Sequence, residues 1–497
     1  MRHLNRIWLS TLALALVSGL SGCGSMRNYK AETDSLASAA AGNNLNAAIA
    51  TLEENNKGDD KDLLYFFEKG ALLHAKNDIP ASTQAWLSAD EKIKLWEDAV
   101  KTDPGKVMGQ VGSFLVNDKT RRYDGYDYEK VMLSTLLAVN HTLTGNWENA
   151  RTEIKKTHER EALIAEFRAK EYEKQEEEAK GKNIKTTYKE LKGYPVETLD
   201  DPDVTALKNG YQSAFSHYLA GFVYEAMGEP SLAAPGYRKA IELRPAVGIL
   251  EDGLSGVDGR PRKRKTGETD VLFIIEAGTA PARQSMAIPL PFFWRGGLNY
   301  TQVSFPVIKP DRSVFVPTEL QVGKERVAVS EITSIDAMSR RALRDDLPGI
   351  IVRTTIRAIA KGATQKELSK AGGWAGLAGG LLGAVATAVT EKADERVWRT
   401  LPARIAIGRA VLPAGQHTLT LPAPGGVQRF DITVAGKYAI VPLRIMGPTT
   451  YALQPDVTKL ASASALGASH EPDADTASAA ELKPAKQAGK KTRKKSK

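Results

Sequence analysis

The chain has 497 residues, of which 42% are hydrophobic and 26% charged, and it contains a single cysteine. This length predicts two or more domains, and one cysteine excludes an intramolecular disulfide. The formal net charge of +9 is in the direction typical of nucleic-acid-binding proteins, but residues 483–497 alone carry eight cations and no acid. The basic character therefore belongs to a tail, and we expect no nucleic-acid partner.

Residues 1–22 have the features of a secretory signal peptide. Arg2 and Arg6 precede residues 7–20, which carry no charge, and small residues follow. The sequence Leu20-Ser21-Gly22-Cys23 resembles the lipobox of bacterial lipoproteins. That resemblance implies cleavage between Gly22 and Cys23 and acylation of Cys23, with palmitate among the acyl chains.

An acylated Cys23 would attach the mature chain to a membrane by its first residue. Each buried methylene contributes about 0.8 kcal/mol, so several acyl chains form a durable tether. Gly24 and Ser25, with no aspartate after the cysteine, resemble lipoproteins of the outer membrane. We therefore expect an outer-membrane protein that faces the periplasm. The alternative is a chance cysteine beside an uncleaved anchor, although residues 7–20 are too few to span a bilayer.

Residues 23–254 have a helical pattern and predict a helical repeat domain. Residues 217–245 resemble a tetratricopeptide repeat, in which two antiparallel helices pack through small residues and aromatic rings. The packing positions are Gly221, Tyr224, Ala233, Tyr237 and Pro245 in this copy, and Gly70, Trp86, Ala138 and Ala150 in two weaker copies upstream. Such repeats form a solenoid whose concave face binds peptides or partner helices. The alternative is a helical spacer.

A basic linker is expected at residues 255–269, followed by a β-rich domain at 270–455. Its short apolar runs, separated by glycine and proline, favour a sandwich or a small barrel rather than a parallel sheet. Two helical stretches, 337–368 and 371–397, are expected as insertions, and residues 456–497 as a disordered basic tail. The predicted fold class is therefore α+β and multidomain: a tetratricopeptide-like helical solenoid, then a sandwich-like domain with two inserted helical stretches.

Residues 371–390 carry no charge and are rich in glycine and alanine. Gly372, Gly376, Gly380 and Ala384 recur at every fourth position, which leaves one helix face almost without side chains and permits very close helix contact. We expect this helix to pack inside the β-rich domain. Pairing between protomers and contact with a membrane are the alternatives.

Six stretches together resemble an uncharacterised family of bacterial lipoproteins with an N-terminal repeat array. They are residues 126–131, 150–153, 276–281, 351–361, 391–396 and 398–402. The resemblance implies a place in the cell envelope, near peptidoglycan-related lipoproteins, and carries no activity with it.

No catalytic motif and no metal or cofactor pattern stands out in the sequence. Asp394, Glu395, Arg396 and Trp398 are the best candidates for a polar constellation, but a structural ion pair beside a buried tryptophan explains them equally well. We therefore expect a scaffold that is not an enzyme, has no cofactor and docks other envelope proteins. Its basic end, from Lys490 to Lys497, would contact the anionic cell wall or lipid headgroups. The alternatives are an accessory of an export or pore complex that uses helix 371–390, and a cell-wall enzyme.

Overall fold

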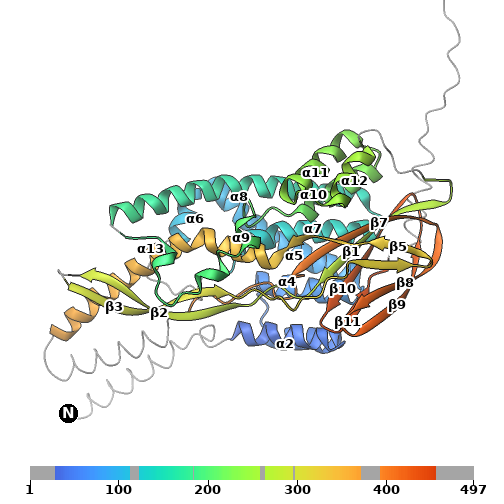
Figure 1. The fold of residues 1–497 in the computed structure, drawn as a ribbon. Helices are drawn as coiled ribbons and strands as arrows, with labels where there is room; N and C mark the ends of the chain where they lie inside the picture. Colours follow the sequence, from blue (N-terminus) through green and yellow to red (C-terminus); the bar gives the residue numbers. More distant parts are fainter. Residues whose placement is uncertain are drawn as a thin grey trace, which may run out of the picture.

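The computed structural model describes residues 28–111, 122–182, 184–257, 264–294, 297–370 and 392–454. Within these ranges a helical region is followed by a strand-rich region, so the predicted α+β class is confirmed (Figure 1). Several predicted features lie outside the described residues: Gly22 and Cys23, then Gly372, Gly376, Gly380 and Ala384, and the tail 456–497.

Antiparallel helix pairs make up most of the helical region: α2 with α3, α4 with α5, α7 with α8, and α10 with α11. The helices are α2 (Tyr29–Ala41), α3 (Leu45–Asn55), α4 (Leu63–Ala75), α5 (Ile79–Thr102), α6 (Pro104–Val111), α7 (Asp127–Leu143), α8 (Trp147–Gly181), α9 (Pro202–Thr205), α10 (Ala214–Ala226), α11 (Pro230–Leu243) and α12 (Gly248–Val257), with the 3₁₀ turns η3 (Tyr188–Glu190) and η4 (Val196–Thr198) after α8.

These four hairpins share one turn conformation. The turn residue has a left-handed φ of 59° at Asn43, 63° at Asn77, 72° at Gly145 and 76° at Gly228. Glycine and asparagine are the residues that tolerate this conformation at a helix end. In each turn the left-handed amide donates back to the preceding helix, as from Asn77 to the carbonyl oxygen of His74 at 2.8 Å. Asn43 precedes Asn77 by 34 residues, the repeat length, and this first hairpin was missed in the sequence.

Two glycines bring the helices of their hairpins into close contact. A Cβ atom on Gly70 would lie 2.2 Å from Cδ1 of Trp86, and one on Gly221 would lie 2.7 Å from Cδ1 of Tyr237. Both distances are far below van der Waals contact, so each ring rests directly on the backbone of the preceding helix. The other packing positions proposed from the sequence are distributed as follows: Tyr224, Ala138, Ala150 and Ala233 are buried, and Pro245 is exposed after α11.

The strands form two larger sheets and a ribbon. A five-stranded sheet has the order β11-β10-β1-β7-β6, a four-stranded sheet the order β5-β4-β8-β9, and β2 pairs with β3. All described pairs are antiparallel except the central pair of β1 with β10. The strands are β1 (Glu268–Ala277), β2 (Arg283–Trp294), β3 (Gly297–Ile308), β4 (Glu319–Val322), β5 (Glu325–Ala328), β6 (Ser330–Ser334), β7 (Arg404–Pro413), β8 (Gly415–Ala423), β9 (Gly426–Val434), β10 (Tyr438–Met446) and β11 (Thr449–Ala452).

Strand β1 is buried on both of its faces. Val271, Phe273 and Ile275 pack between the two larger sheets, whereas Leu272 and Ile274 pack against the helices. Strands buried on both faces have continuous apolar runs, as β1 has at residues 271–275. The helical region and the strand-rich region therefore share a hydrophobic core, in three layers of helices, five-stranded sheet and four-stranded sheet.

An elongated arm extends from this layered body (Figure 1). It consists of the far part of α8, the ribbon of β2 and β3, and α13 (Ile335–Lys370), which continues through Pro348. Tyr194, Phe305, Leu343 and Leu347 belong to its small apolar core. Helix α13 occupies the place of the first predicted insertion, 337–368.

Two boundaries drawn from the sequence need correction. The basic linker was expected at residues 255–269, but residues 255–257 belong to α12 and 268–269 to β1. Residues 258–263 between them lie outside the described chain. The second inserted helix was expected to reach residue 397, but residues 392–397 have no regular secondary structure. The amide of Ala393 donates to the Ser285 hydroxyl on β2, and the amide of Arg396 donates to the side chain of Asp394 in the same segment.

Candidate functional site

Trp398 lies at the junction between the segment 392–402 and the helical region. Its side chain is fully buried, at 0% exposure. The indole stacks on Phe67 with ring centroids 4.4 Å apart and meets Trp86 edge-on at 5.9 Å. The segment that leads into β7 is therefore anchored on the hairpin of α4 and α5.

Two buried carboxylates hold the backbone of this segment. Glu129 on α7 accepts the amide of Trp398 at 2.7 Å. Glu68 on α4 accepts the amides of Arg399 at 2.5 Å and Thr400 at 3.1 Å. Burial raises the pKa of each carboxyl to about 7, although the hydrogen bonds that they accept lower it. These acids resemble ordinary surface residues in the sequence, and no sequence signal identified them.

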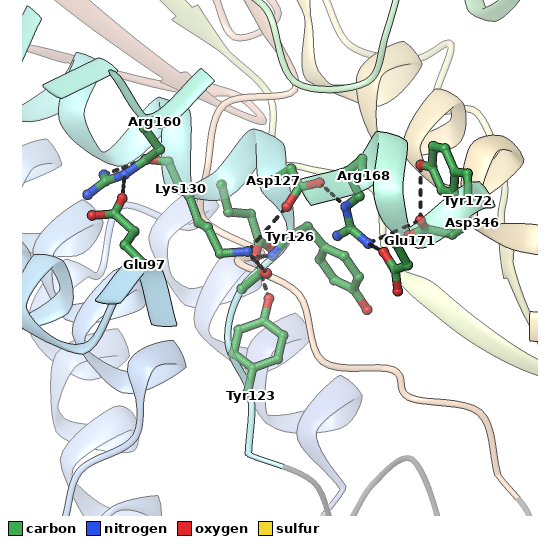
Figure 2. A network of polar contacts seen from close by, with 12 residues as sticks. Glu97, Tyr123, Tyr126, Asp127, Lys130, Arg160, Arg168, Glu171, Tyr172 and Asp346 are labelled. Atoms are coloured by element: carbon green, nitrogen blue, oxygen red, sulfur yellow. Dashed lines mark hydrogen bonds and ion pairs between the residues drawn. The ribbon is translucent and has the colours of Figure 1, made fainter. Parts of the chain in front are cut away.

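A network of charged side chains continues from Glu129 along α7 and α8 (Figure 2). Lys130 donates to Asp127 at 3.3 Å, and Arg168 donates to Asp127 at 2.6 Å and to Glu171 at 2.5 Å. Burial alone would raise the pKa of Asp127, but Arg168 and Lys130 outweigh it and hold that pKa at about 2. Most charges in this buried network are therefore matched by an opposite charge.

Asp346, on α13 in the arm, is the last member of the network. Its carboxylate lies 3.6 Å from Arg168 and accepts a hydrogen bond from the Tyr172 hydroxyl at 3.4 Å. Burial raises the pKa of Asp346 to about 6, although the positive charge of Arg168 lowers it. The network thus joins the hairpin of α7 and α8 to α13.

A cavity of about 170 Å³ opens beside this network, between α7, α8, α13 and β2. Arg283 on β2 lines the cavity and is 6% exposed. Its guanidinium lies 4.4 Å from the centre of the Tyr126 ring, and its Nε donates to the carbonyl oxygen of Asp394 at 3.5 Å. No pattern in the sequence marks Arg283.

The polar constellation proposed from the sequence is divided between this cavity and the core. Asp394 and Arg396 line the cavity and form an ion pair at 2.7 Å. Glu395 accepts a hydrogen bond from the amide of Ser285 at 3.3 Å. Trp398 is in the core, so the arrangement matches the alternative of a structural ion pair near a buried tryptophan.

A second buried polar network ties the hairpins to β1. His74 Nδ1 lies 2.7 Å from Oδ1 of Asn140, and its Nε2 lies 3.2 Å from Glu276 on β1. Asn140 also donates to Ser82 at 3.0 Å. These contacts indicate that His74 has a structural role in packing. In the described ranges, no three histidine, cysteine or acidic side chains form a group that could hold a metal ion.

Searches of protein-family models, curated proteins and solved structures find no match to this chain. The relation to envelope lipoproteins therefore rests on the sequence resemblance alone. Among the helices of the described residues, none combines the length and the apolar character needed to cross a membrane.

Proposed function

We propose that the protein is a scaffold anchored by lipid in the bacterial outer membrane, facing the periplasm, and that it docks other envelope proteins. The sequence Leu20-Ser21-Gly22-Cys23 carries the anchoring part of this proposal. The docking part is supported by the hairpins, whose turns at Asn43 and Asn77 follow the spacing of tetratricopeptide repeats. We infer a tetratricopeptide-like array on this basis.

The inner helices of the array, α4, α7 and α10, are covered by the protein's own strands. Almost every residue of α7, from Asp127 to Leu143, is buried, and apolar residues of α4 and α10 share a core with β1. The surface on which such arrays usually bind peptides is thus occupied within the same chain. We propose that partners dock instead on the outer helices α5, α8 and α11, where Leu95 is 60% and Leu232 44% exposed.

The anchor is tested by Cys23→Ala in cells. We expect this variant to leave the membrane fraction and to remain folded, because the acyl chains, and no part of the described fold, provide the attachment. Ser25→Ala is the matched control and should stay in the membrane fraction. A Cys23→Ala protein that remains membrane-bound after alkaline extraction would contradict the lipid anchor.

The docking surface is tested by photo-crosslinking in intact cells. A crosslinker at Leu95 on α5 or at Leu232 on α11 should give discrete adducts with other envelope proteins. Val427 on β9 is the control, since it is 67% exposed but lies on the opposite sheet. Adducts only at Val427, or none at either helix position, would refute docking through the outer helices.

A further inference from the structure

The ribbon of β2 and β3 has an inner face that packs in the arm and an outer face that is exposed. Ile288 and Val303 lie opposite each other on the inner face, where they are 1% and 4% exposed in the apolar core shared with α13. The residues that alternate with them, Ala287, Pro289 and Gln302, are exposed. Because successive residues of a strand point to opposite faces, the backbone register extends both faces along the ribbon.

The outer face becomes apolar and aromatic toward the end of the ribbon, which is also the end of the arm (Figure 1). Its last two residue pairs are Pro291 with Tyr300 and Phe293 with Leu298. No residue from 284 to 308 is acidic, and Arg295 is the only cation among them. An apolar surface at the end of a projecting element marks a site of contact with another surface.

The composition of this end matches a phospholipid surface. Tryptophan and tyrosine are enriched where a membrane meets water, and Trp294 and Tyr300 stand near the turn of the ribbon. Anionic headgroups attract cations and repel acids, so a segment with Arg295 and no acid suits them.

The start of the described chain lies at the base of the same ribbon. The ring of Tyr29 lies 5.9 Å from the guanidinium of Arg396. The segment that contains Arg396 is bonded to β2, because the amide of Ala393 donates to the Ser285 hydroxyl at 2.9 Å. The residues between Cys23 and Tyr29 span at most about 20 Å, and strands of twelve residues are about 40 Å long. The membrane that holds the proposed anchor is therefore within reach of the ribbon.

We infer that the end of the ribbon inserts into the headgroup region of the phospholipid leaflet to which the protein is anchored. Residues 290–294 and 297–301 lie beyond the last exposed pair and extend about 17 Å, whereas a bilayer core is about 30 Å thick. The ribbon therefore enters one leaflet and does not span the membrane. The inference rests on the proposed anchor for the position of the membrane.

This contact orients the body of the protein on the membrane, and the acyl chains hold it there. A few inserted side chains give a reversible contact, whereas several acyl chains give a durable one. Cys23→Ala should therefore still leave the membrane fraction.

The test places one fluorophore in the full-length, acylated protein reconstituted in vesicles of phosphatidylethanolamine and phosphatidylglycerol. Cys23 is the only cysteine and is blocked by acylation, so Leu298→Cys supplies a single labelling site. Phospholipids that carry a quencher near the headgroup should lower the fluorescence at this site by at least about half. Val427→Cys is the matched control, since Val427 is an apolar residue that is 67% exposed on β9, and its fluorescence should not change.

Phe293→Gln, on the same face as Leu298, should reduce the quenching of the fluorophore at position 298, because it removes apolar area from the inserted surface. Val427→Gln is the control and should leave the quenching unchanged. The Tm of both variants should equal that of the parent protein, which shows that the fold is intact. Equal quenching in these two variants, or equal quenching at positions 298 and 427, would overturn the inference.

A fluorophore at position 298 that is shielded from aqueous iodide but is not quenched by lipid would also overturn it, because a protein would then cover the ribbon. The outcome for the anchor is separate. If Cys23→Ala leaves the membrane fraction and position 298 is not quenched, the anchor stands and the ribbon contact is wrong. If Cys23→Ala stays membrane-bound and position 298 is quenched, the ribbon contact stands and the anchor is wrong.

Discussion

The carboxylate of Glu68 accepts the backbone amide of Arg399 at 2.5 Å, across 331 residues of sequence. The same carboxylate accepts the amide of Thr400 at 3.1 Å, so one buried acid on α4 holds two consecutive residues before β7. Glu129 on α7 accepts the backbone amide of Trp398 in a similar way. These acids therefore determine where the strand-rich region joins the helices.

Replacing Glu68 with glutamine should destabilise the protein by about 1–3 kcal/mol, because one of the backbone amides then faces a donor instead of an acceptor. The free energy of unfolding, measured with urea at pH 7, checks this. Glu54→Gln, at an exposed position of α3, is the control and should stay within about 0.5 kcal/mol of wild type. A Glu68→Gln protein as stable as the control would show that the attachment of residues 399–400 to α4 does not depend on this carboxylate.

Stability should fall as the pH rises from about 5 to 8. Burial raises the pKa of Glu68 and of Glu129 from 4.5 to about 7, so between these values the folded protein holds protons that the unfolded chain has released. The contribution is complete below 4.5 and is lost as the pH rises through 7. It amounts to up to about 3 kcal/mol for each group.

Urea unfolding at several pH values above 5 measures this effect. Asp127, with its pKa near 2, stays ionised there and contributes a constant amount, whereas Asp346, whose pKa burial raises to about 6, adds a fall of the same sign. The double variant Glu68→Gln/Glu129→Gln should show a shallower dependence of the unfolding free energy on pH. Equal slopes in the variant and the wild type would mean that neither carboxyl titrates in this window.

Gly70→Ala should destabilise the protein by about 1–3 kcal/mol, since a methyl group 2.2 Å from Cδ1 of Trp86 forces the helices apart. Gly221→Ala should act in the same direction through Tyr237. Gly256→Ala is the control: it lies in α12 with no atom near its added Cβ, so it should be neutral or slightly stabilising. Thermal unfolding of the three variants checks the order, and similar Tm values for all three would refute it.

Trp398→Ala should cost about 3–5 kcal/mol, because it leaves a cavity between Phe67 and Trp86. The expected loss is larger than for Trp147→Ala, whose side chain is only partly buried at the start of α8. Denaturant unfolding of both variants provides the comparison. Equal losses in unfolding free energy would mean that neighbouring side chains fill the space left by Trp398.

The helix hairpins could be predicted from the sequence because their turns and contacts depend on local spacing. Gly70 with Trp86 and Gly221 with Tyr237 stand at the same separation, and the small residue and the ring must meet when two helices fold back. Strand β1 was also predictable, since it is a continuous apolar run. The elements that cover its two faces could not be predicted, because an apolar sequence indicates burial but does not indicate which other element packs against it.

Arg283, Glu68 and Glu129 escaped prediction for a related reason. Charged residues usually lie on the surface, and each of these is buried by segments distant in sequence. Strand β11 was also not predicted. It has only four residues, and its position depends on β10 and on the first described helix.

The contact between β11 and α2 joins the two ends of the described chain, so it forms late in synthesis. Thr449 and Tyr451 on β11 donate hydrogen bonds to the carbonyl oxygens of Ala41 and Ala40 at the end of α2, both at 2.7 Å, and Met446 completes the apolar cluster beneath them. At roughly 5–20 residues per second, a ribosome makes α2 about 20–80 s before β11. Throughout that interval α4 covers part of this apolar cluster through Tyr65 and Leu72, and the part that Met446 later covers stays open to solvent.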